Sequence, residues 1–193
     1  REKKIQVLKV EAKPAKRNPS PPFMTSTLQQ EASRKLNLGT KQTMSVAQKL
    51  YEAGLITYMR TDGIDMTLEA VQEARSEIKK QFGDNYLPEK PRIYKNKARN
   101  AQEAHECIRP TSLKNLPRSL AKLDDLQRKL YDLIWKRTIS SQMASAEIKE
   151  TKIDIGPENQ EFLLRASGIE TSFDGFKKVY LESHDSDHEE NGD

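Results

Sequence analysis

The stretch YEAGLITYMRTDG, residues 51–63, joins the end of a regular element to a run of reactive side chains. Its Ala-Gly pair is typical of a helix end. LITYMR, which follows, is apolar and β-branched enough to predict a short strand over residues 55–60. Side chains alternate between the two faces of a strand. We therefore expect Tyr58 and Arg60 to share one face, with the residues before and between them on the other.

A phenol and a guanidinium on one face suggest phosphate chemistry. The phenol has a reference pKa of about 10, so its use as a nucleophile requires cations that stabilise the phenolate. The planar fork of Arg60 matches phosphate oxygens. A half-buried Tyr58 beside a solvated arginine explains the same two residues without any chemistry.

Two helices are predicted before this stretch. The first is capped by Thr25 or Ser26 and ends at Gly39. The second begins near Thr43 and ends at Gly54. Helix, turn, helix and strand together form the skeleton of a winged-helix domain.

Further helices are predicted from Thr67 to Gly83 and over residues 123–137, where apolar residues keep helical spacing. Trp135 lies off that apolar stripe, and we expect it to be a core residue.

QEAHECIRP, residues 102–110, predicts a short helical turn that ends at Pro110. His105 and Arg109 are four residues apart, which places them on one helical face, whereas Glu106 is expected to point elsewhere. The cationic pair could bind a phosphodiester, or His105 could pass a proton to a leaving alkoxide. A helix end decorated by cations is an equally good explanation.

Strands are predicted at both ends of the chain, over residues 3–12, 147–155, 161–169 and 176–181. The proline-rich PAKRNPSPPF, residues 14–23, predicts a linker. With the helices between the strands, the fold class is mainly α with α+β character, a helical winged-helix-like (CAP-like) domain inserted into a β module.

Composition and charge limit the classes of partner that the chain could bind. The net charge is +4, but six of the 29 acidic residues lie in the last twelve positions, which contain no Lys or Arg. The rest of the chain is therefore more basic than the total suggests, which suits a polyanion or an ordinary solvated surface. The single cysteine, Cys107, indicates a reducing compartment. No apolar run is long enough for a membrane span.

The sequence gives little support for other kinds of catalytic or binding site. The sequence contains no metal-ligand spacing, and it lacks a glycine-rich phosphate loop, which argues against nucleotide hydrolysis. Polar residues at the predicted start of the first helix, among them Ser26, Thr27 and Gln30, could meet phosphates, although capping explains them equally well. Asp62 with Gly63 is most simply a turn.

Four motifs in order, PPFMTSTLQQEASRKL, YEAGLITYMRTDG, QEAHECIRPT and FDGFKKVY, resemble the central part of bacterial-type DNA topoisomerase I, a type IA topoisomerase. The resemblance runs from the first residues to about Tyr180. Where the family usually continues with serine after Arg-Thr-Asp, this chain has Gly63.

The resemblance implies that Tyr58 attacks a phosphodiester of single-stranded DNA, forms a 5′-phosphotyrosine and frees a 3′-hydroxyl, with religation independent of ATP. It implies that Arg60 stabilises the transition state. His105 and Arg109 match family positions near the DNA backbone, and Thr61 and Asp62 are also expected to bind DNA.

The family fold implies that residues 20–142 form the tyrosine-bearing helical domain. Residues 1–19 and 143–182 would form part of a β arch. Residues 183–193 have no counterpart in the family, and we expect them to form a disordered acidic tail or linker because they lack apolar residues. Mg²⁺ would be held by a Toprim domain that this chain lacks, so the chain alone is expected to be inactive.

The N-terminus is neither a signal peptide nor a start methionine, so we expect a fragment of a longer protein. The expected substrate of the parent protein is single-stranded and negatively supercoiled DNA. A monomeric parent in the bacterial cytoplasm at the nucleoid is expected, with an organelle as the alternative location.

Two other functions compete with this one. The chain could be a non-catalytic winged-helix DNA-binding module in which Tyr58 is structural, or a protein-interaction domain whose positive charge is incidental. Both predict that removing the phenolic hydroxyl changes nothing.

Overall fold

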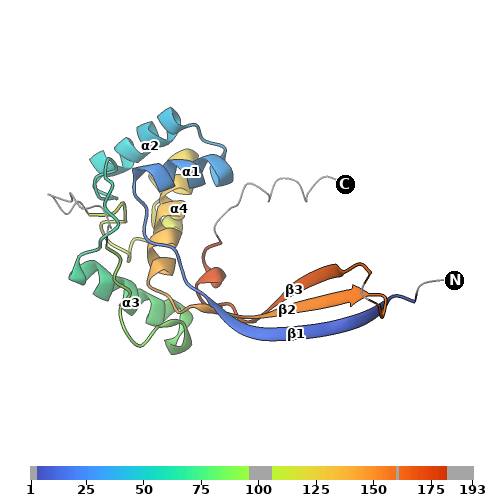
Figure 1. Cartoon of the computed structure of the whole chain (residues 1–193). Helices are drawn as coiled ribbons and strands as arrows, with labels where there is room; N and C mark the ends of the chain where they lie inside the picture. The colour runs from blue at the N-terminus through green and yellow to red at the C-terminus, as the bar shows by residue number, and fades with distance from the viewer. Residues whose placement is uncertain (1–3, 96–105, 160, 182–193) are drawn as a thin grey trace. The chain divides into compact units, whose positions relative to one another are not determined.

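The computed structural model describes residues 4–95, 106–159 and 161–181 (Figure 1). Four α-helices and a three-stranded antiparallel sheet form within these residues. The fold is therefore α+β.

The chain divides into two units. The sheet unit comprises the chain up to Asn18 together with Ser145–Gly175. The helical unit comprises Pro19–Ala144 together with the chain from Phe176 onward. Each unit is thus discontinuous in sequence, because the helices are inserted between the first and second strands.

Three long strands form the sheet unit: β1 (Gln6–Arg17), β2 (Ala146–Gly156) and β3 (Leu164–Phe173), in the order β1-β2-β3. Side chains of neighbouring rows point to opposite faces of the sheet. Val10, Ile153 and Ala166 occupy one row of register partners. The next row contains Lys9, Asp154 and Arg165, and the Asp154 carboxylate accepts hydrogen bonds of 2.7 and 3.0 Å from Arg165.

Two expectations about the strands were wrong. Strand β1 continues through Pro14, opposite Lys149, so the linker does not begin there. An edge strand tolerates proline because its missing N–H can face solvent. Residues 176–181 do not form a strand; the 3₁₀ helix η3 (Gly175–Lys178) occurs there, and Tyr180 is buried in the helical unit.

The helices follow their expected signals closely. Thr67 accepts a 3.2 Å hydrogen bond from the Ala70 N–H, and Asp124 and Gln127 form a reciprocal capping box. Three bounds differ. Met24 caps the first helix, so Thr25 and Ser26 lie inside it, and this helix ends at Leu36, before Gly39. Gly39 instead caps the second helix, and Thr43 lies buried inside that helix. The four helices are α1 (Thr25–Leu36), α2 (Thr40–Glu52), α3 (Leu68–Phe82) and α4 (Asp125–Ser141).

Helix α4 is the centre of the helical unit. It packs against α1, α2 and α3, with α1 and α2 near one end and α3 near the other (Figure 1). Leu130, Ile134 and Ile139 are fully buried. Trp135 is also buried, as expected, and its indole N–H donates to the Leu113 carbonyl at 3.0 Å.

A buried polar cluster joins distant parts of this unit. The Arg137 Nε donates to the Pro21 carbonyl at 2.7 Å, and its guanidinium lies 4.9 Å from the centre of the Phe23 ring. The Tyr180 hydroxyl donates to the buried Glu31 carboxylate. Burial, with this hydrogen bond, raises the pKa of Tyr180. Residues on both sides of the inserted helices thus meet in one core.

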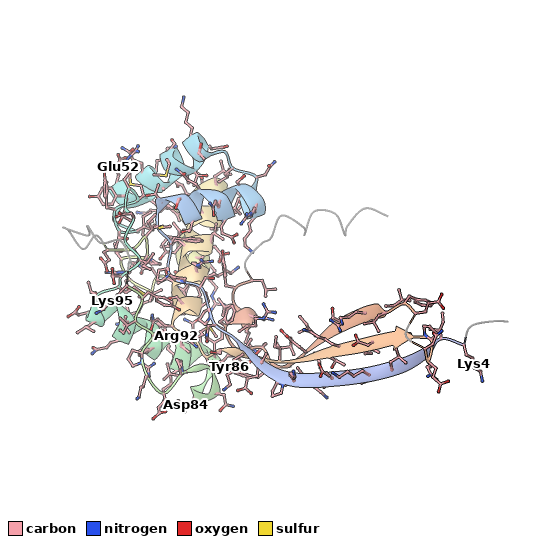
Figure 2. All side chains as sticks on the ribbon, viewed as in Figure 1. Lys4, Glu52, Asp84, Tyr86, Arg92 and Lys95 are labelled. Carbon is pink, nitrogen blue, oxygen red and sulfur yellow. The ribbon has the colours of Figure 1, made fainter. Side chains whose placement is uncertain are left out.

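The segment that follows α3 and η1 (Asp84–Tyr86) is fastened to the end of α4. The Gln142 amide accepts from the Arg92 N–H at 3.2 Å and donates to the Arg92 carbonyl at 3.0 Å. Figure 2 labels Arg92 in this position. In the part that the structure describes, this segment is therefore hydrogen-bonded to the end of α4.

Candidate functional site

The loop that carries Tyr58 follows α2 directly, and it is not the strand expected over residues 55–60. Only Ile56 makes a bridge, with Pro110, and the neighbouring backbone bonds are few. The Thr57 N–H donates to the Arg109 carbonyl at 2.9 Å, and the Leu55 carbonyl accepts from Thr111 at 3.0 Å. A winged-helix strand is therefore absent at this position, because the pairing is too short to form a ladder.

The loop nevertheless alternates between solvent and core. Tyr58, Arg60 and Asp62 are exposed, whereas Met59 and Thr61 are buried. This places the phenol and the guanidinium on the solvent side, and the buried residues between them fix the loop to the core.

Tyr58 is half exposed and stands against a second tyrosine. Its ring lies 5.3 Å from that of Tyr51, edge to face, and Tyr51 comes from the last turn of α2. Within the described residues the Tyr58 hydroxyl has no hydrogen-bond partner. The ring is thus supported, while the phenolic oxygen has no partner among the residues that the structure describes.

Arg60 is an exposed cation beside a polar groove. Over the part of the chain that the structure covers, its guanidinium makes no ion pair or hydrogen bond. The groove is lined by the following residues in addition to Arg60: Gln29, Thr40, Lys41, Met44, Ser45 and Gln48. An unpaired guanidinium that needs no internal partner is available to an anion.

The segment Glu106–Pro110 is extended and not a helical turn. Alternate residues pair with three different parts of the chain: Glu106 with Asp65, Ile108 with Phe23, and Pro110 with Ile56. These long-range bridges prevail over the local helical pattern.

The side chain of Arg109 consequently bonds to other groups of the protein. Its Nε lies 2.5 Å from Glu106 Oε1, its Nη1 donates to the Pro110 carbonyl at 2.8 Å, and its side chain is only 13% exposed. The expectation that Glu106 points away from Arg109 was wrong. His105 lies outside the described residues.

The remaining predicted contact residues fall into two groups. Thr61 and Thr27 are bonded internally: Thr61 Oγ1 accepts from the Gly63 N–H at 2.9 Å, and Thr27 Oγ1 accepts from the Met24 N–H at 3.1 Å. Ser26, Gln30 and Asp62 have exposed side chains.

Cys107 lies in the core beside the loop. Burial, with a smaller contribution from the nearby Glu106 carboxylate, raises the pKa of its thiol to about 12. The thiol is therefore neutral and unreactive at ordinary pH.

Sequence reasoning missed three residues around the loop: Tyr51, Thr25 and the bonding role of Thr57. Thr57 Oγ1 donates to the Cys107 carbonyl at 2.6 Å and accepts from the Arg109 N–H at 3.0 Å. Tyr51 stands seven positions before Tyr58, but only the end of α2 brings the two rings together. No local signal identifies the partners of the two threonines.

The described residues do not suit a metal ion. Across residues 4–95, 106–159 and 161–181, no three His, Cys, Asp or Glu side chains gather as ligands. In the same part of the chain, no helix is long and apolar enough to cross a membrane.

The comparisons with known proteins agree with this geometry. The family model described as DNA topoisomerase matches residues 1–192. DNA topoisomerase 1 of Rickettsia bellii is 52% identical over 195 residues, which cover 96% of this chain and 24% of that protein. The enzyme of Xylella fastidiosa is 46% identical over 200 residues, with 98% and 24% covered.

A solved structure is also similar. Full-length topoisomerase I from Thermotoga maritima superposes with a TM-score of 0.81 at 34% identity, over 95% of this chain and 30% of that one. The chain thus spans about a quarter of the length of the curated relatives that it matches. On this evidence, the chain belongs to the bacterial-type DNA topoisomerase I family.

Proposed function

We propose that the parent protein relaxes negatively supercoiled DNA by cutting and rejoining one strand, with Tyr58 as the nucleophile. One observation carries the proposal: the Tyr58 hydroxyl is free and solvent-facing, two residues from an exposed guanidinium that has no partner within the described residues. Membership of the topoisomerase family supports the assignment.

The reaction is a transesterification. The Tyr58 oxygen bonds to phosphorus as the phenol loses its proton, and the bond from phosphorus to the 3′ oxygen breaks. The leaving 3′ oxygen takes up a proton, and the phosphate stays on the 5′ side as a phosphotyrosine. One phosphoester replaces another, so the reverse attack by the 3′-hydroxyl rejoins the strand without ATP.

Arg60 would stabilise the charge that develops on the phosphate oxygens in both directions. A guanidinium with two parallel donors suits this task, and it is most effective when it is fixed before the reaction. The exposed Ser26, Gln30 and Asp62, together with His105, are proposed to contact the strand near the cut.

Arg109 and Thr61 have a different role in this proposal. Because both are bonded internally, they would support the loop, and any contact of theirs with DNA would be secondary.

Each of the two units is proposed to correspond to one part of the family fold. The helical unit would be the domain that presents the tyrosine, with α1 and α2 as the helix-turn-helix of a winged-helix-like arrangement, and the sheet unit would be part of the β arch. Mg²⁺ would bind a Toprim domain outside this chain. We propose that this chain alone does not cleave DNA, and that the parent is a monomer in the cytoplasm.

The test uses the full-length parent protein and a 3′-labelled single-stranded oligonucleotide in the presence of Mg²⁺. After denaturation, label attached to the wild-type protein and absent from Tyr58→Phe would support the proposal. Tyr51→Phe is the matched control, because it removes a neighbouring hydroxyl and keeps the ring pair. An adduct that persists in Tyr58→Phe would refute Tyr58 as the nucleophile, whereas no adduct even with the wild-type protein would favour a non-catalytic DNA-binding module.

A further inference from the structure

The loop that carries Tyr58 and Arg60 needs support that a strand ladder would otherwise provide. Its backbone groups are partly buried, and a buried N–H or C=O without a partner is costly. The bonds that hold residues 59–61 should therefore reveal what fixes Arg60. They converge on one side chain, that of Thr25, the first residue of α1.

Thr25 bonds the peptide groups on both sides of Arg60. Its Oγ1 lies 2.8 Å from the Met59 carbonyl and 2.9 Å from the Thr61 carbonyl, so its one hydrogen can serve either. The same oxygen accepts from the Thr61 N–H at 2.8 Å. The Thr25 N–H also donates to the Thr61 carbonyl at 2.9 Å.

These bonds connect the loop to a rigid element. Helix α1 is anchored in the core by Leu28 and Ala32, which are fully buried. Thr25 is itself partly buried, and Thr61 is only 8% exposed, so water competes little for these groups. The position of the Arg60 backbone is therefore fixed by α1 as well as by the loop itself.

We propose that Thr25 is a positioning residue that acts through Arg60, an inference that rests on the proposed function. The hydroxyl holds the two peptide groups that flank Arg60, and this fixes the direction in which the guanidinium leaves the loop. Loss of the hydroxyl would leave the Arg60 charge in place but misplace it. Small misplacements of a catalytic group can cost about 100-fold in rate.

The experiment measures single-turnover adduct formation by the full-length parent on an oligonucleotide, with the affinity for the uncleaved strand measured separately. Thr25→Val removes the hydroxyl and keeps the shape, and we expect cleavage to slow by about 10- to 100-fold with a much smaller change in affinity. Thr25→Ser keeps the hydroxyl and should cleave at close to the wild-type rate.

Thr138→Val is the matched control. Thr138 is fully buried in α4 and its hydroxyl donates to the Ile134 carbonyl at 2.9 Å, so this variant also loses a buried hydroxyl bond. It should lower the melting temperature without slowing cleavage. If rates follow melting temperatures across all three variants, Thr25 acts on stability alone and the proposal fails.

A double-mutant cycle with Arg60→Ala supplies the decisive readout. If Thr25 acts through Arg60, Thr25→Val should slow cleavage no further in the Arg60→Ala background. Additive losses would overturn the proposal. Tyr58→Phe, measured in parallel, separates the two hypotheses: an adduct that survives it refutes the proposed function, whereas an adduct that it abolishes leaves Thr25 to be judged by the cycle.

Discussion

The helical unit and the sheet unit of this chain are stabilised in different ways. The helical unit has a core around α4, in which Phe23, Ile134 and Tyr131 are fully buried. In the sheet unit, Val10 and Ile169 are each 59% exposed, and side chains stand out from both faces of the strands (Figure 2). The comparison teaches that the loop carrying Tyr58 and Arg60 lies where the core is, because packing can hold a loop that has no strand ladder of its own.

The largest difference between the units should appear in catalysis. Arg60→Ala in the full-length parent should slow adduct formation by about 10²- to 10³-fold, the usual cost of removing a charge-stabilising donor. Arg165→Ala removes an equally cationic side chain from β3, where it is paired with Asp154, and should leave the rate unchanged. Equal losses in a single-turnover assay would mean that both cations act through general attraction to DNA.

The second-largest difference between the units should appear in stability, when an isoleucine side chain is truncated in each. Ile134→Ala should lower the free energy of unfolding of the helical unit by about 3 kcal/mol, since it removes a fully buried side chain from close packing. Ile169→Ala is the matched variant on β3 and should change stability by less than about 0.5 kcal/mol. Urea unfolding followed by Trp135 fluorescence reports on the helical unit, because the chain has a single tryptophan, and far-UV circular dichroism reports on the sheet unit as well. A comparable loss in both variants would show that the sheet also relies on packing.

Alkaline pH should destabilise the helical unit selectively. The buried Cys107 thiol ionises near pH 9 when unfolded but only near pH 12 when folded, so the unfolded state loses its proton first. Stability should therefore fall as pH rises above 9, by about 1.4 kcal/mol per pH unit from this group. Burial raises the pKa of Tyr131 and of Tyr180 in the same direction.

The measurement is the urea midpoint from Trp135 fluorescence between pH 8 and 11. Cys107→Ala should make the decline shallower. The sheet unit contains neither cysteine nor tyrosine, so far-UV changes assigned to it should not follow this trend. An unchanged slope in Cys107→Ala would contradict the assignment.

A smaller effect is expected at a helix end. Thr67→Ala removes the cap of α3 and should cost about 1 kcal/mol of stability, whereas Thr67→Ser should retain the cap. Thermal melts of the two variants distinguish them. If both behave alike, the hydroxyl bond to the Ala70 N–H does not contribute to stability.

The smallest effect should be found at acid pH, in the sheet unit. The guanidinium of Arg165 lowers the pKa of Asp154, and the ammonium of Lys9 lowers that of Glu11. A lowered pKa gives stability above the unfolded value that is lost as pH falls through the folded one, so this change lies below about pH 4. Asp154→Asn should weaken the acid dependence of the far-UV signal slightly and leave Trp135 fluorescence unaffected.

Local sequence signals determined much of the architecture. The Thr67 cap and Gly83 set the ends of α3, and alternation in residues 146–156 set β2. The motif also pointed to Tyr58 and Arg60, which are both solvent-facing. These features were accessible because caps, glycines and periodicity act over a few neighbouring residues.

Tertiary structure decided which residues contact and hold the loop that carries Tyr58 and Arg60. Thr25 reaches Thr61 across 36 positions, and Tyr180 reaches Glu31 across 149. The bridges at Glu106–Pro110 replaced a local helical pattern and took Arg109 into the interior. Propensity carries no information about such partners, because they meet only when the core around α4 closes. The sequence by itself thus pointed to Tyr58 and Arg60, and only the folded core determined which residues hold the loop that carries them.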